Sequence, residues 1–144
     1  MHNLSHTAYI KNWQSLAESR FFGHILLLLA GALGYGLVEI FWRGHTHWSM
    51  LMAGAICVWA VDYLDRRAGG LPDLAKALLC GLIITTVELL FGMAFNFYAD
   101  AGVWDYSALP FNFLGQICLY YTLIWVALSV ILLRLVRWLR QGLV

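Results

Sequence analysis

Long apolar runs separated by short polar segments dominate the chain. At 1.5 Å per residue, about 20 apolar residues cross the roughly 30 Å hydrocarbon layer of a membrane, and the second run here is the shortest. We therefore expect helices at about 21–42, 48–64, 74–95 and 113–139. This pattern predicts an all-α, polytopic membrane protein in which residues 1–144 form one transmembrane domain, a bundle of four transmembrane helices.

The segment before the first run has a different pattern. Within residues 1–20, Ile10, Trp13 and Ala17 recur at helical spacing and alternate with charged and polar residues. One apolar face and one polar face are typical of a helix that lies in the membrane interface. We expect an interfacial N-terminal segment.

Composition agrees with a membrane location. Hydrophobic residues make up 62% of the chain, charged residues only 12%, and the mean hydropathy is +0.73. Soluble domains carry roughly 25% charged residues, so a soluble fold of this size is excluded. The three cysteines, Cys57, Cys80 and Cys118, lie inside apolar runs and are interpreted as packing residues. We expect the lipid bilayer, and not nucleic acid, as the main partner.

The basic residues are unevenly distributed between the two sides of the predicted membrane. Eight of the nine Lys and Arg residues lie within segments 1–20, 65–76 and 134–140, which belong to one side, and only Arg43 falls on the other side. Basic residues concentrate in cytoplasmic segments. We therefore predict a multi-pass protein of the cytoplasmic membrane with both termini in the cytoplasm, and outward-facing segments at 43–47 and 98–112.

Two short sequence matches suggest an internal repeat. Val38-Glu39-Ile40 resembles Val87-Glu88-Leu89, and residues 54–57 resemble residues 115–118. Two helices per unit would give two tandem parallel repeats. Matches this short also arise by chance in apolar sequence, so both interpretations stay open.

Glu39 and Glu88 are the most informative residues. A carboxylate inside a spanning helix is costly, about 2.5 to 3.5 kcal/mol on insertion scales, and normally faces protein or a water-filled cavity. Both glutamates stand on stripes of small residues, which let helices approach closely. If the first and third helices pack together, the two carboxylates share one outward cleft, within about 10 Å. The alternative is that each glutamate only orients its helix through a loop hydrogen bond.

Further polar residues belong to the same side of the membrane. Asn96 lies eight residues after Glu88 on a similar helix face, and Asp105, Asn112 and Gln116 come from the loop before the fourth helix. Asp105 fits a turn with Ser107, and Asn112 fits a helix cap. We predict Glu39, Glu88, Asn96, Asp105, Asn112 and Gln116 as solute-binding residues.

Three segments carry a family resemblance: GYGLVEIFWRGHTHWSM, TTVELLFGMAFN and VWDYSALPFNFLGQICLYYTLIW. They resemble the small multi-spanning bacterial proteins grouped as ABC-transporter permeases of the CmpB-like, type IV kind. The resemblance covers about residues 24–130 and implies a bacterial inner-membrane location and a role in transport. The chain itself has no nucleotide-binding loop.

These observations favour a small transporter, or the membrane subunit of one, that binds a cationic or protonatable solute through paired glutamates. Because four helices make a thin wall for a pathway, we expect a homodimer or a larger membrane partner. One alternative is a non-catalytic accessory protein that packs against a partner through Gly31, Gly34 and Gly36. Another is an intramembrane enzyme acting on a lipid or apolar substrate. We expect no catalytic residues, no cofactor and no metal site, since His45 and His47 alone provide too few ligands.

Overall fold

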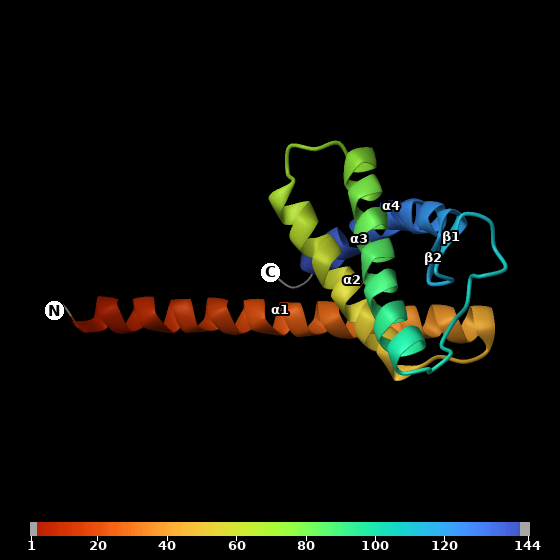
Figure 1. Ribbon diagram of the computed structural model, residues 1–144. Coiled ribbons are helices and arrows are strands. Elements are labelled where there is room, and N and C mark those ends of the chain that lie inside the picture. The colour runs from red at the N-terminus through yellow and green to blue at the C-terminus, as the bar shows by residue number, and fades with distance from the viewer. Residues whose placement is uncertain (1–2, 142–144) are drawn as a thin grey trace.

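The computed structural model describes the backbone of residues 3–141 and the side chains of residues 21–141. This part of the chain is almost entirely helical (Figure 1). The elements are α1 (Asn3–Arg43), α2 (Trp48–Arg67), α3 (Asp73–Phe91), the π-helix η1 (Gly92–Tyr98), β1 (Asn112–Phe113), β2 (Ile117–Cys118) and α4 (Leu119–Gln141). The expected all-helical, membrane-like character is confirmed.

Three helical segments are long and apolar enough to cross a membrane. They are Phe21–Arg43, Asp73–Tyr98, where α3 continues into η1, and Leu119–Gln141. Helix α2 has 20 residues, but its last turns carry Asp62, Asp65, Arg66 and Arg67, which lower its hydropathy. A four-span bundle is therefore not confirmed, and the fourth crossing stays a prediction.

Two helix boundaries differ from the expected ones. Helix α1 is continuous from Asn3 instead of beginning near residue 21. The side chains of residues 1–20 lie outside the described part of the structure, so the interfacial placement of this segment stays a prediction. Helix α4 begins at Leu119 instead of near 113, because Phe111, Leu114 and Gly115 have φ values of 54°, 53° and 68°, which no α-helix accommodates.

The helices pair in chain order. Helix α1 packs mainly on α2, and α3 mainly on α4. Figure 1 shows the turn after α1 and the long loop before α4 at one end of the molecule, away from the α2–α3 turn and the end of α4. The close packing of α1 on α3, on which a shared cleft was made conditional, is not a main helix contact of the structure. The small residues serve the hairpins instead: Gly31 faces Gly54 of α2, and Gly81 faces Val126 of α4.

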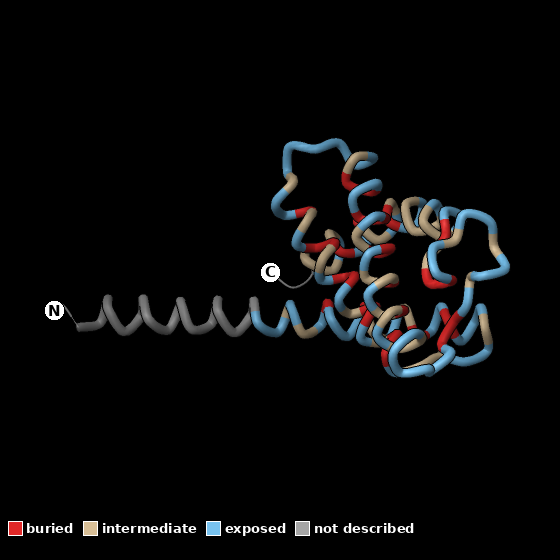
Figure 2. Tube along the Cα trace, viewed as in Figure 1, coloured by how far each residue is buried: buried red, intermediate tan, exposed pale blue. Residues whose placement is uncertain are grey.

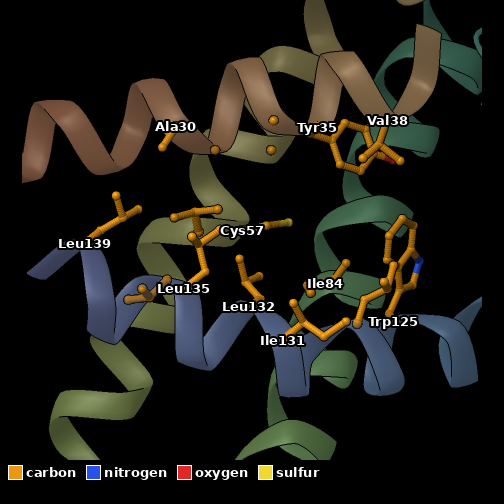
Figure 3. A pocket seen from close by; sticks show the side chains of 16 residues that line it. Ala30, Tyr35, Val38, Cys57, Ile84, Trp125, Ile131, Leu132, Leu135 and Leu139 are labelled. Carbon is orange, nitrogen blue, oxygen red and sulfur yellow. The ribbon is translucent and has the colours of Figure 1, made fainter. Parts of the chain in front are cut away.

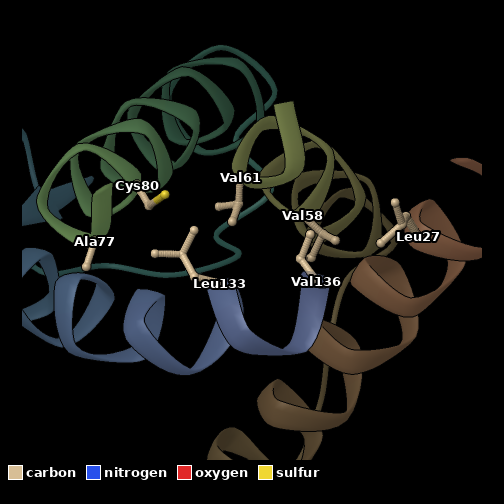
Figure 4. Packing of buried hydrophobic residues seen from close by; sticks show 7 residues of the cluster. All are labelled: Leu27, Val58, Val61, Ala77, Cys80, Leu133 and Val136. Carbon is tan, nitrogen blue, oxygen red and sulfur yellow. The ribbon is translucent and has the colours of Figure 1, made fainter. Parts of the chain in front are cut away.

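A core of buried apolar side chains joins all four helices. It comprises Leu27, Val58, Val61, Ala77, Cys80, Leu133 and Val136 (Figure 4). Figure 2 shows that buried positions gather where the helices meet, while outward positions are exposed. Many exposed side chains are large and apolar, Leu37 and Leu82 among them. Such a surface suits hydrocarbon and not water.

The ends of α2, α3 and α4 are tied together by ion pairs around Asp65, which we call the Asp65 cluster. The Asp65 carboxylate, 6% exposed, accepts hydrogen bonds from Lys76 Nζ at 2.9 Å, Arg137 Nη2 at 2.7 Å and Arg140 Nη2 at 2.7 Å. Arg140 also pairs with Asp62, and Arg137 with the exposed Asp73. The charged residues at these helix ends therefore form one network around the buried Asp62 and Asp65.

Candidate functional site

Glu39 lies in the last turns of α1 and is 5% exposed. Its Oε1 pairs with Arg43 Nη1 at 3.4 Å, and its Oε2 accepts a hydrogen bond from Thr46 Oγ1 at 2.7 Å. Arg43 also donates to the carbonyl of Val103 in the long loop. Glu39 thus has a cationic partner, and that partner connects α1 to the loop.

Glu88, near the end of α3, is equally buried but has different partners. The Tyr106 hydroxyl donates to Glu88 Oε1 at 2.8 Å, and Trp125 Nε1 donates to Oε2 at 3.0 Å. Both donors are neutral. No Lys, Arg or His in the described part of the chain forms an ion pair with Glu88. Glu88 is therefore a buried carboxyl group without a cationic partner among residues 21–141.

The two carboxyl groups belong to different helix pairs, Glu39 to α1 and α2 and Glu88 to α3 and α4. They share no hydrogen-bonding residue. The rings of Tyr35, one turn before Glu39, and Trp125 have centroids 6.0 Å apart. The Tyr35 ring of α1 therefore lies against the indole that donates to Glu88, a contact that the sequence did not indicate.

Asn96 and Gln116 are joined and support the loop. Asn96 Nδ2 donates to Gln116 Oε1 and to the Trp104 carbonyl, both at 2.9 Å, and Asn96 Oδ1 accepts from Val103 N at 2.6 Å. The indole of Trp104 in turn donates to the Gln116 carbonyl at 2.8 Å. This amide pair holds Val103 and Trp104 in an apolar cluster with Met50 and Ala53.

Asp105 and Asn112 form hydrogen bonds within the loop. Asp105 accepts from the backbone N–H of Ser107 at 2.8 Å and from its hydroxyl at 2.9 Å, as the predicted turn requires. These bonds, the backbone one first, hold the pKa of Asp105 below its usual value. Asn112 lies in β1 and bonds to Ser107, Leu109 and Gly115, so it does not cap α4. Neither residue is hydrogen-bonded to a glutamate.

Sequence reasoning missed three of the residues that contact the carboxylates. Thr46, Tyr106 and Trp125 supply the donors, and each comes from a segment distant in sequence from the glutamate or across a turn. Burial raises the pKa of Tyr106, and the nearby charge of Glu88 adds to this effect, so the phenol keeps its proton. The signal was present in part, because buried Tyr and Trp need partners for their polar tips.

The histidines of the first outer turn are used locally. His47 is the N-cap of α2, where Nδ1 accepts from Ser49 N at 3.3 Å, and His45 contacts the Arg43 backbone. Within the described residues, no group of three or more His, Cys, Asp or Glu side chains could hold a metal ion.

An apolar groove runs beside this site. Helices α1 and α4 form its walls and α2 its floor, where Cys57 lies (Figure 3). Its volume is about 260 Å³, and aliphatic side chains such as Leu135 and Leu139 make up most of its lining. Tyr35 and Trp125 lie at one end of the groove. The groove therefore ends at Trp125, whose indole donates a hydrogen bond to Glu88.

One sequence-family model covers all the residues of this site. A family model described as "Putative ABC-transporter type IV", of the CmpB kind, matches residues 12–144. No curated protein and no solved structure matches the chain. The family match includes every predicted site residue and confirms the resemblance seen in the three sequence segments. The chain therefore belongs to the CmpB-type ABC-transporter type IV family.

Proposed function

We propose that this chain is the membrane subunit of a transport system, or a small transporter itself, and that it takes up a cationic or protonatable solute at Glu88. Membership of an ABC-transporter family and helices that suit a membrane support the general role. The state of Glu88 carries the specific proposal. It is 5% exposed, accepts hydrogen bonds only from neutral donors, and has no ion-pair partner in the described chain.

The contrast with Glu39 sharpens the proposal. A charge taken out of water costs several kcal/mol unless a counter-charge or good hydrogen bonds offset it. Glu39 has that counter-charge in Arg43, at 3.4 Å. Glu88 lacks one, so a proton or a cation that reaches it removes an energetic cost instead of adding one. The paired-glutamate site thereby reduces to one receptor carboxylate, with Glu39 and Arg43 as its electrostatic neighbours.

The proposal also includes a fourth membrane crossing, cytoplasmic termini and a homodimer. Helix α2, at about 30 Å, would serve as the fourth crossing, with both termini in the cytoplasm of a bacterial inner membrane. Asn96 and Gln116 would frame the outer end of the site, and Asp105 and Asn112 would shape its loop. A homodimer would supply the thicker wall that a pathway needs.

The accessory-protein alternative loses part of its support. Gly31 and Gly36, two glycines of the expected docking stripe, already contact Gly54 and Leu51 of α2. Only Gly34 of the three has no atom within 4 Å of the point where a β-carbon would stand. Two of the three glycines therefore pack against α2 of the same chain and leave little of the stripe for a partner.

Replacing Glu88 with glutamine should lower proton flux and ethidium binding in proteoliposomes by about tenfold or more, because a contact to a charged group is worth about 1.5 to 3 kcal/mol. Flux is followed with a pH-sensitive dye trapped in the vesicles. Glu88→Asp should retain part of the activity. Asp100→Asn is the matched control, since Asp100 is exposed and has a φ of 51° that asparagine tolerates.

The proposal is overturned if Glu88→Gln is folded, as judged by gel filtration and circular dichroism, and shows unchanged flux and unchanged ethidium binding. Loss of both activities in Asp100→Asn as well would also count against a specific role for Glu88.

A further inference from the structure

The groove between α1 and α4 has walls that belong to membrane-crossing segments. Phe21–Arg43 and Leu119–Gln141 are both apolar enough to lie in hydrocarbon. Figure 3 shows Leu135 and Leu139 of α4 directed toward α1 across the groove, with Cys57 of α2 behind them. Inside a bilayer the surrounding solvent is lipid chains, so a hollow on this face is open to acyl chains and not to water.

Gly34 indicates that the hollow is built into α1. Glycine inside a helix costs up to about 1 kcal/mol relative to alanine, and it is usually explained by close packing. Gly31 has that explanation, since a β-carbon there would lie 2.6 Å from the Gly54 carbonyl oxygen. Gly34 does not, because no atom lies within 4 Å of the position where its β-carbon would stand. Gly34 lines the groove and leaves space that no side chain of the described residues fills.

The groove has the length and the ends that suit a single hydrocarbon chain. Along α4, from Leu139 to Trp125, it extends about 14 residues, or roughly 21 Å at 1.5 Å per residue. One leaflet of the hydrocarbon layer is about 15 Å thick, so a chain from the leaflet nearest Leu139 would have to lie extended along the groove to reach the far end. There the rings of Tyr35 and Trp125 close the path.

We propose that this groove is a binding site for one acyl chain of a membrane phospholipid, which enters beside Leu139 and ends against Tyr35 and Trp125. The site does not depend on solute binding at Glu88. It gives the bilayer direct contact with Trp125, the indole that donates to the Glu88 carboxylate. Chain occupancy would hold Trp125 in the position in which this hydrogen bond forms.

The test uses a phosphatidylglycerol whose acyl chain carries a diazirine, incorporated with the full-length protein into proteoliposomes. After illumination, mass spectrometry locates the labelled residues. Cys57 and Val58 form the groove floor and are only 8% and 9% exposed, so a chain reaches them through the groove. We expect labelling at these two residues in the wild type.

Gly34→Phe should fill the groove and reduce labelling of Cys57 and Val58 by about tenfold. The matched control is Leu33→Phe, because Leu33 is 62% exposed on the adjacent position of α1 and does not line the groove. It should label like the wild type. Thermal unfolding in detergent should change little for Gly34→Phe, since its β-carbon meets no atom within 4 Å and its ring would lie in the groove.

Three results would overturn the assignment. The first is equal labelling of the floor in Gly34→Phe and the wild type, and the second is labelling confined to outward residues. The third is a change of oligomeric state in Gly34→Phe by native mass spectrometry, which would show that a second copy of the chain occupies the groove.

Discussion

Asp65→Ala is expected to lower the free energy of unfolding by about 3 to 5 kcal/mol, the cost of leaving buried charges without their partner. Asp65 accepts hydrogen bonds from Lys76, Arg137 and Arg140. The removal of the Asp65 carboxylate affects Lys76 most, because the Lys76 side chain is 7% exposed and has no other ion-pair partner in the described chain. Unfolding in mixed micelles with increasing dodecyl sulfate measures the change.

Asp73→Ala is the matched control for this experiment. Asp73 also pairs with Arg137 at 2.7 Å, but its side chain is 60% exposed, and exposed pairs contribute about 0 to 1 kcal/mol. Equal losses in the two variants would show that burial does not decide the strength of the Asp65 cluster. A loss below about 1 kcal/mol for Asp65→Ala would show that the cluster is not a main support of the fold.

Gly81→Ala is expected to lower the free energy of unfolding by about 1 to 3 kcal/mol, the typical cost of overpacking. A β-carbon at Gly81 would lie 2.9 Å from both Cα and N of Val126, and closer still to its side chain. Because backbone atoms cannot rotate away, α3 and α4 would have to separate. The same micelle titration measures this loss.

Gly34→Ala provides the opposite expectation for a glycine in a membrane helix. Its β-carbon meets no atom within 4 Å, so the substitution should be neutral or stabilise the helix by up to about 1 kcal/mol. A similar loss in both alanine variants would mean that helix flexibility, and not close packing, explains the role of Gly81.

The Gly81 contact and the Asp65 cluster act on the same pair of helices. The cluster fixes one end of α3 and α4, and the Asn96–Gln116 amide pair fixes the loop at the other end. Gly92 contributes there, because a β-carbon on it would lie 2.5 Å from Gln116 Oε1. Glu88 therefore stands on a helix that is held at both ends, while α1 packs mainly on α2.

The hydrophobic pattern by itself determined the helical membrane character of the chain, and residues near 39 and 88 stood out because carboxylates are rare in such runs. Apolar periodicity is a local property, so it can be read without knowing which helices meet. The resemblance in three segments likewise predicted the family. The beginning of α4 was missed, because Phe111 and Leu114 adopt positive φ values although neither is a glycine, so their residue types did not indicate that the loop continues past Pro110.

Only the tertiary structure decided what each charge contacts. In the sequence, Arg137 and Arg140 only mark a cytoplasmic segment, yet they reach back 72 to 75 residues to Asp65. Glu39 and Glu88 look equivalent in the sequence, yet one is paired with Arg43 and the other is bound by Tyr106 and Trp125. The energy of a buried charge depends on partners that come from other helices, and a pattern along one helix carries no information about those partners.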